Sequence, residues 1–460
     1  MLFALSLLLA CPSKGPSGPP GPVDSGASSV GPRAELVARG FVVGEGAMVF
    51  STMEGCCDEG ANCWGNNPST PYGTHAVPPA PGQPTRDDAL LEAFGPIPPG
   101  LSRDFLLRPD EALVWLGTLP PPARYFGFRS YLGERPGAER YVIGSLGPSL
   151  NHQTIEAQRG GPAWGEPLAV VTTADAAVEA DVVDALVASG WAPEHIHFDR
   201  LPPGVVSLGL DATVNDTLFT VARVAVYDDP AAGAAWEAAP GEVWRLTPTE
   251  ERPVQSPHEV GALLPRGDGA TEAAWQEAWV DLAEGVAAAH LSDDGTLAKV
   301  IPYWRETIAC IDSSLSCTGD LRDRYVGVSP YFELPTPDSY LVSFGVNHER
   351  TGSSTYASVS IQTITNQRGI TSFDSLDMVG SARTYTDHAL VDDLYAVVWA
   401  RDCTPFAGVC VEVPWDCPGG GADERFKITA RAYLEPTTGA APLPEEMLDD
   451  MVYLVIPEAP

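Results

Sequence analysis

LAVVTTADAAVEADVVDALVASGWAPEHIHF, residues 168–198, determines which fold class the chain can adopt. Its first six residues are apolar or β-branched, which is typical of a buried strand. Asp175 then stands where a helix N-cap belongs, and apolar residues continue until Gly190 ends the helix. The segment from His195 to Phe198 returns as a strand. The pattern therefore predicts a β-α-β crossover at about 168–199, with its two strands parallel.

Outside this unit the pattern consists mostly of strands, with few helices. The longest expected helix runs from Thr271 to His290, because Trp275, Trp279, Leu282 and Val286 recur on one face. Strands are expected at 112–117, 125–131, 140–146, 219–227, 243–246, 340–346, 356–364, 394–400 and 426–434. Together they predict an α+β protein with mixed or antiparallel sheets, of a ferredoxin-like kind with helices on one face.

Turn-forming residues are concentrated near the N-terminal end of this pattern. The region from Arg33 to Gly100 is expected to be irregular, apart from a strand at Leu36–Val43 and a short helix at Asp87–Phe94. We therefore predict an α+β domain over residues 34–300 that begins with an irregular, cysteine-containing segment. Residues 301–460 are predicted to form a β-rich domain that contains disulfides.

The first eleven residues, Met1-Leu-Phe-Ala-Leu-Ser-Leu-Leu-Leu-Ala-Cys11, place a short apolar run directly before a cysteine. This run is too short to span a bilayer, and a Pro-, Gly- and Ser-rich spacer follows it up to about residue 33. The arrangement resembles the lipobox of bacterial lipoproteins. The resemblance implies a signal peptide at 1–10, a lipidated Cys11, a tether at 11–33 and a bilayer partner. It also implies a place in the bacterial cell envelope, at the outer membrane or cell surface.

The charge of the chain limits its partners. The sequence holds 61 acidic and 27 basic residues, which gives a formal net charge of −34, and only three of the basic residues are lysines. A surface with this excess of negative charge repels the phosphates of nucleic acids. We therefore expect no nucleic-acid partner. Cations or a basic protein remain as candidate partners, and the sequence identifies neither a cofactor nor an oligomeric state.

Eight cysteines remain when Cys11 is set aside, an even number that suits a disulfide-bonded exported protein. They fall into three groups: Cys56, Cys57 and Cys63; Cys310 and Cys317; Cys403, Cys410 and Cys417. We expect a bridge between Cys310 and Cys317 and a second bridge within the last group. The first and the last group each hold three cysteines, so neither group can pair all of its cysteines internally. We therefore predict at least one long bridge between the N-terminal and C-terminal regions of the chain.

Motifs for catalysis are sparse. The sequence has no phosphate-binding loop, zinc-protease motif or calcium loop. The candidate catalytic residues are His348, at a strand end beside Asn347 and Glu349, and two others, Ser149 and Asp387. Ser149 lies in a segment similar to the Gly-Asp-Ser-Leu block of exported esterases, although Pro148 replaces the aspartate.

Candidate metal ligands are equally few. The pair Asp387-His388 has Asp392 and Asp393 close by, so carboxylates and an imidazole could meet there. His195 and His197 are expected on one face of a strand, where two imidazoles could chelate a metal.

Two functions fit these observations. The first is a binding or structural module of the cell envelope, which would present an aromatic patch from Tyr72 or from Tyr125–Tyr131. The alternative is an exported hydrolase or metal-dependent enzyme that uses His348. The two differ in whether His348 lines a pocket with other titratable groups.

Overall fold

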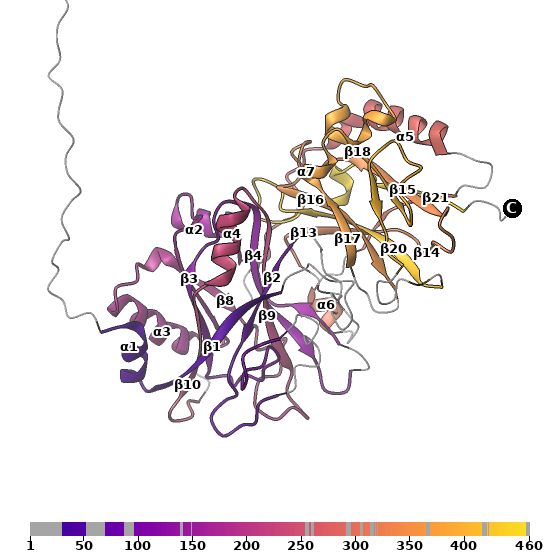
Figure 1. Ribbon diagram of the computed structural model, residues 1–460. Helices are drawn as coiled ribbons and strands as arrows, with labels where there is room; N and C mark the ends of the chain where they lie inside the picture. The colour runs from indigo at the N-terminus through magenta and orange to yellow at the C-terminus, as the bar shows by residue number, and fades with distance from the viewer. Residues whose placement is uncertain are drawn as a thin grey trace, which may run out of the picture.

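The computed structural model describes residues 30–51, 70–86, 96–138, 141–148, 150–253, 257–258, 262–290, 296–303, 307–312, 317, 319, 321–364, 369–415, 421 and 423–456. Within these residues the chain is an α+β protein with mixed and antiparallel sheets, as the sequence predicts. Figure 1 shows two lobes, an N-terminal lobe in indigo to magenta and a C-terminal lobe in orange to yellow. No helix in the described part is long and apolar enough to cross a membrane.

A ten-stranded sheet forms the N-terminal lobe. Its strands are β1 (Phe41–Ser51), β2 (Tyr72–Ala76), β3 (Ala112–Thr118), β4 (Ala123–Glu134), β5 (Gly144–Ser145), β6 (Leu150–Asn151), β7 (Pro167–Thr173), β8 (Ile196–Arg200), β9 (Thr217–Tyr227) and β10 (Glu242–Pro248). They follow the order β5-β4-β9-β2-β1-β10-β3-β7-β8, with β6 beside β4. The pairs are antiparallel except β7 and β8.

Strand β1 joins the two halves of this sheet by changing partners along its length. Its first half pairs with β10 and its second half, from Ala47, pairs with β2. Gly46 stands at the change, where a Cβ atom would lie 2.5 Å from the carbonyl oxygen of Ala76. Only glycine allows so close an approach. A single large core around Trp115 and Phe128 then receives side chains from both halves.

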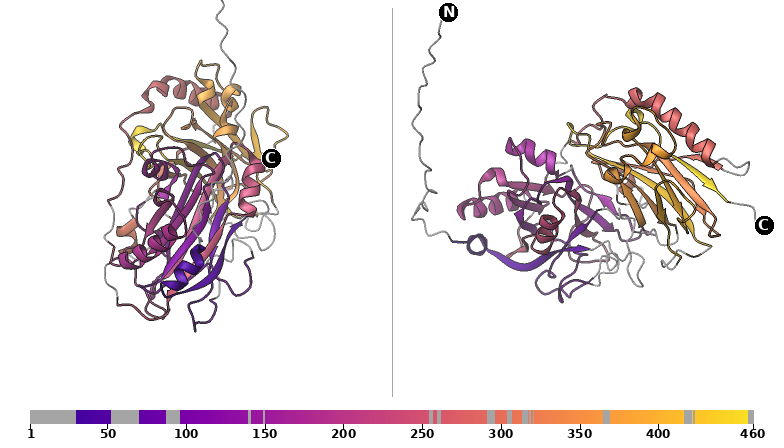
Figure 2. Two further views of the ribbon diagram at one scale, coloured as in Figure 1. Left: turned by 90° about the vertical axis from the view of Figure 1, so that its left-hand side faces the viewer. Right: turned by 45° about the horizontal axis from the view of Figure 1, so that its top comes forward.

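The predicted β-α-β crossover is confirmed. Helix α3 (Ala176–Ala188) joins β7 to β8, and the Asp175 side chain accepts hydrogen bonds from two backbone N–H groups of its first turn. Figure 2 shows purple to magenta helices packed along the sheet of this lobe. Helix α3 and α1 (Pro32–Ala38) pack on one face of β3, where Val114 is buried. The opposite face carries Trp115, together with Ile155 of α2 (His152–Arg159) and Trp236 of α4 (Pro230–Ala238). Helices thus cover both faces, and the expected ferredoxin-like arrangement is wrong.

The N-terminal region is more regular than the sequence suggested. Leu36 lies in α1 and is fully buried, so the predicted strand at Leu36–Val43 is wrong in its first half. Pro32 explains the helix, because proline suits the first turn. The strand β1 is eleven residues long and β2 follows within the region expected to be irregular. The helix predicted at Asp87–Phe94 lies outside the described residues.

The C-terminal lobe is a β-sandwich with one long helix on its outside. One sheet has the order β11-β21-β15-β18-β19 and the other β12-β13-β20-β16-β17, with β14 beside β20. The strands are β11 (Thr296–Lys299), β12 (Ile301–Pro302), β13 (Arg324–Val328), β14 (Phe332–Glu333), β15 (Tyr340–Val346), β16 (Tyr356–Thr363), β17 (Gly369–Asp374), β18 (Leu394–Ala400), β19 (Cys410–Glu412), β20 (Arg425–Tyr433) and β21 (Met451–Val455), and the helices are α5 (Gln276–His290) and α7 (Ser375–Met378). The short helix α6 (Thr307–Asp312) lies between β12 and β13 in the sequence but packs against β5 of the N-terminal lobe.

Strands β15 and β18 are buried on both faces, which explains their continuous apolar sequence. Leu341 and Trp399 face the second sheet of the sandwich. Val342 and Phe344 face the opposite way, against Leu282 of α5. The long helix predicted at 271–290 is confirmed, with a 3₁₀ turn over Glu272–Trp275 before α5.

Two disulfides close within the described residues. Cys310–Cys317, as predicted, joins α6 to the segment after it and packs in the core around Trp115. Cys403–Cys410 is the bridge expected within the last cysteine group. Cys11, Cys56, Cys57, Cys63 and Cys417 lie outside the described residues, so the long bridge stays a prediction. The predicted domain boundary at residue 300 also stays a prediction.

Candidate functional site

His348 is buried in a cluster of charges inside the C-terminal lobe. It follows β15 directly and is only 4% exposed. Its Nδ1 lies 2.8 Å from the Glu272 carboxylate and its Nε2 lies 3.8 Å from Asp450. Glu272 also accepts hydrogen bonds from the Thr351 hydroxyl, at 2.5 Å, and from the Leu448 backbone N–H, at 2.6 Å. Three segments distant in sequence therefore meet at one imidazole.

The cluster favours the charged form of His348. Burial alone would lower the pKa of the imidazolium, but the carboxylates of Glu272 and Asp450 outweigh burial and raise this pKa to about 10. Burial would likewise raise the pKa of Glu272, but His348 lowers it. An imidazolium that keeps its proton at neutral pH cannot accept another as a general base. The geometry suits a stabilising role for His348.

The other predicted catalytic residues do not complete a catalytic set in the described structure. Ser149 lies outside the described residues. Asp387 is exposed, and His388 accepts a hydrogen bond at Nδ1 from the backbone N–H of Leu390, at 3.1 Å. Asp392 and Asp393 bind Arg383 and Arg350 in surface ion pairs, at 2.8 and 3.1 Å.

The predicted histidine pair does not form a chelate. His195 ends a 3₁₀ turn at Pro193–His195 and only His197 lies in β8, so the two do not share one strand face. His197 is fully buried, with its Nδ1 3.0 Å from Gln158 Oε1. Burial lowers its pKa to about 4, and Arg159 and His195 contribute. Among the described residues, no group of three or more His, Cys, Asp or Glu is placed to hold a metal ion.

The predicted aromatic patch is not on the surface. Tyr72, Tyr125 and Tyr131 are 4%, 0% and 1% exposed. They lie where the N-terminal sheet meets the C-terminal lobe. The Tyr125 hydroxyl donates to Asp323, at 3.0 Å, and its ring packs against Tyr433, with centroids 4.7 Å apart. The expectation of a surface patch from these tyrosines is therefore wrong, because they serve the contact between lobes.

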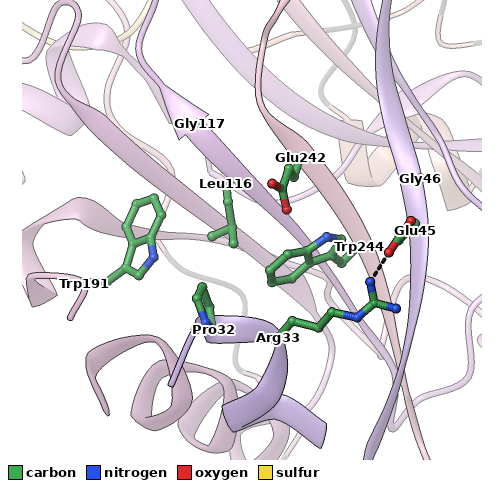
Figure 3. Close-up of a pocket in the computed structure, with 10 residues that line it drawn as sticks. Pro32, Arg33, Glu45, Gly46, Leu116, Gly117, Trp191, Glu242 and Trp244 are labelled. Carbon is green, nitrogen blue, oxygen red and sulfur yellow. Dashed lines mark hydrogen bonds and ion pairs between the residues drawn. The ribbon is translucent and has the colours of Figure 1, made fainter. Parts of the chain in front are cut away.

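An open pocket lies instead on the N-terminal lobe, at the start of α1. It has a volume of about 630 Å³. Figure 3 shows two indoles, Trp191 and Trp244, with the Leu116 side chain between them. The rest of the lining comes from Gly31, Pro32, Arg33, Glu45, Gly46, Gly117 and Glu242.

The charged groups at this pocket lie at its rim. Arg33 forms an ion pair with Glu45, and the two side chains are 54% and 65% exposed. Glu242 is exposed as well. One of the two exposed carboxylates is thus already paired with an arginine, and the two do not form a buried pair. The arrangement can instead offer hydrogen bonds beside an apolar floor, which is the usual composition of a ligand pocket of 300–1,000 Å³.

Sequence reasoning missed this pocket. Its lining comes from α1, from strands β1, β3 and β10, and from Trp191 after α3. No local motif joins these residues. The only signal in the sequence is that Trp191 follows the predicted helix and Trp244 lies in a predicted strand. That signal does not show that the two tryptophans lie close together, because the order of the strands in the sheet is not predictable from local patterns.

Comparisons with known proteins give no function. No protein-family model and no curated protein matches the chain. Among solved structures, an uncharacterised protein from Burkholderia cenocepacia is 12% identical, over 90% of this chain and 82% of that chain, with a TM-score of 0.38. A structural-genomics target protein from Vibrio parahaemolyticus is 12% identical, over 77% of this chain and 88% of that chain, with a TM-score of 0.34.

Proposed function

We propose that the chain is an exported, lipid-anchored binding module of a bacterial cell envelope, with the pocket of Figure 3 as its ligand site. The observation that carries the proposal is this pocket, which opens where the predicted tether meets the folded body. Two disulfides support export, because such bonds persist in oxidising compartments. The buried, protonated His348 gives the alternative of a hydrolase no support.

The lining of the pocket favours an uncharged ligand with an apolar ring face and several hydroxyl groups, such as a neutral oligosaccharide. The two indoles offer apolar contact, and the rim carboxylates accept hydrogen bonds from hydroxyls. Glu45 is balanced by Arg33, whereas Glu242 leaves a net negative charge that disfavours anions.

The lipid anchor has a direct test. When the full chain is expressed in a bacterium fed an alkyne fatty acid, the wild-type protein should become labelled and sediment with membranes. Cys11→Ala should lose the label and the membrane association, because no other residue can take its place at the predicted cleavage site. Cys417→Ala is a matched control that should keep both. A Cys11→Ala protein that is still labelled would contradict the anchor.

The pocket has a separate test. A neutral tetrasaccharide of N-acetylglucosamine should change the tryptophan fluorescence of the wild-type protein in a saturable way. Trp191→Ala should weaken this binding about tenfold or more, which corresponds to ~1.4 kcal/mol. Trp415→Ala removes an exposed tryptophan outside the pocket and should leave the affinity unchanged. Equal affinities for the two variants would place the binding elsewhere.

A further inference from the structure

Helix α2 lies at the junction of the two lobes and makes hydrogen bonds to the C-terminal lobe. Asn151, which caps the helix, donates from Nδ2 to the carbonyl oxygen of Gly439, at 2.9 Å. Gln153 accepts at Oε1 from the N–H of Gly439, at 2.9 Å, and donates from Nε2 to the carbonyl oxygen of Glu435, at 3.2 Å. Three hydrogen bonds thus join the first turn of α2 to one turn of the C-terminal lobe, at 435–440.

Two buried histidines hold the same helix to the N-terminal lobe. His152, the first residue of α2, is 7% exposed, and its Nδ1 accepts a hydrogen bond from the backbone N–H of Phe126, at 3.4 Å. Its ring stacks on Trp164, with centroids 4.9 Å apart. His197 of β8 is fully buried beneath the last turn of α2, where its Nδ1 lies 3.0 Å from Oε1 of Gln158. The His152 contact requires a neutral imidazole, because a protonated Nδ1 has no lone pair with which to accept a hydrogen bond.

The charged groups around His197 do not favour a proton on it. Arg159 of α2 and His195 of the preceding 3₁₀ turn are close enough to disfavour the imidazolium. The carboxylate of Asp199, two residues along the same face of β8, accepts its hydrogen bond from the Ser130 hydroxyl instead. A proton on His197 would therefore be a buried charge without a counterion.

The surroundings of His152 are similar. Glu156 lies one turn further along α2, but its carboxylate accepts a hydrogen bond from the backbone. From β4, the ring of Tyr125 stands edge-on to the imidazole, at 6.4 Å between centroids. In the described part of the chain, the histidines that pair with carboxylates are His258 and His348. Neither imidazole beside α2 thus has the anion that keeps His348 charged.

Acid should consequently favour the release of α2. Burial lowers the pKa of His152 to about 4. Burial also lowers the pKa of His197 to about 4, with Arg159 and His195 adding to the effect and a backbone hydrogen bond with Glu194 opposing it. An imidazole in water has a pKa of about 6.5, so each histidine takes up a proton when the helix leaves. Between pH 8 and pH 5 this uptake multiplies the population of the released state about 30-fold for each histidine, and roughly a thousandfold for both.

We propose that α2 is a pH-sensitive link between the two lobes, docked by neutral His152 and His197 at neutral pH and released when acid protonates both. Release breaks the three hydrogen bonds to the turn at 435–440. The stacking of Tyr125 on Tyr433 involves no histidine, so the lobes stay joined there while the junction loosens at α2. This link does not depend on the pocket of Figure 3 or on the lipid anchor.

Hydrogen exchange of the full chain, corrected for the intrinsic rate at each pH, tests the proposal. From pH 8 to pH 5 the protection of amides in α2 and in the turn at 435–440 should fall about tenfold or more. Amides of β3 and β7, in the core of the same lobe, should keep their protection. Unchanged protection of α2 would overturn the proposal. An equal loss in β3 and β7 would also overturn it, because acid would then unfold the whole lobe, in which His75 is buried as well.

A double variant assigns the effect to the two histidines. His152→Asn/His197→Asn places an amide oxygen or nitrogen near each Nδ1 and removes both titrating groups, so α2 should stay protected at pH 5. His388→Asn is the matched control, because Nδ1 of His388 also accepts a backbone N–H, at 3.1 Å, but in the C-terminal lobe. It should lose protection of α2 as the wild type does. A double variant that behaves like this control would contradict the proposal.

Gln158→Glu tests the role of His197 while both histidines remain. The new carboxylate would face Nδ1 of His197 and stabilise the imidazolium in the docked state. Protection of α2 should therefore fall less between pH 8 and pH 5 than it does in the wild type. A loss as large as that of the wild type would show that protonation of His197 does not drive the release.

Discussion

Glu111→Ala should destabilise the protein by about 3–5 kcal/mol, because it removes one partner of a fully buried ion pair. Arg245 of β10 and Glu111 are 3% and 0% exposed, and the guanidinium binds the carboxylate through two bonds, of 3.0 and 2.6 Å. The Thr247 hydroxyl and the Arg108 backbone N–H also donate to this carboxylate. Without it, Arg245 would remain charged inside the protein. Urea unfolding at pH 7 measures the difference in free energy of unfolding.

A surface pair of the same chemistry provides the control. Arg383 and Asp392 form a bidentate pair, but their side chains are 64% and 41% exposed. Water and salt screen such a pair, so Asp392→Ala should cost less than about 1 kcal/mol. Equal losses for Asp392→Ala and Glu111→Ala would mean that burial does not set the cost at Glu111. The double variant Glu111→Ala/Arg245→Met should recover part of the loss, since no unpaired charge remains.

Local patterns were sufficient to predict most of the individual elements. The crossover at 168–198 was predictable because its strand, its N-cap at Asp175 and its stop at Gly190 are all set by neighbouring residues. The strand pairing of β1 was not predictable, since its change of partner at Gly46 depends on β2 and β10, which are distant in sequence. The strand expected at Leu36 is wrong for a related reason, because one turn of helix and a short strand give similar apolar patterns.

The candidate sites depend even more on distant contacts. The place of His348 at a strand end makes it a candidate from sequence, but its partners Glu272 and Asp450 lie 76 and 102 positions away and share no motif with it.

His348→Gln should destabilise the protein at neutral pH by about 3–5 kcal/mol, because it leaves Glu272 and Asp450 buried without their cation. The loss should depend on pH. The pKa of His348 is raised from an ordinary value of about 6.5 to about 10 in the folded protein. Its contribution to stability is therefore fully present below pH ~6.5 and is lost as the pH rises through about 10.

Urea unfolding between pH 6 and pH 10 gives the free energy of unfolding of the wild type and of His348→Gln. The difference between the two free energies measures the contribution of His348, because groups that titrate in both proteins contribute equally and cancel. The difference should shrink by about 1.4 kcal/mol per pH unit over this range, the value for one proton. His388→Gln, which removes a histidine without an acidic partner among the described residues, is the matched control. A constant difference between wild type and His348→Gln would show that His348 is neutral in the folded protein. That result would restore His348 as a candidate base, because the free imidazole can accept a proton and the imidazolium cannot.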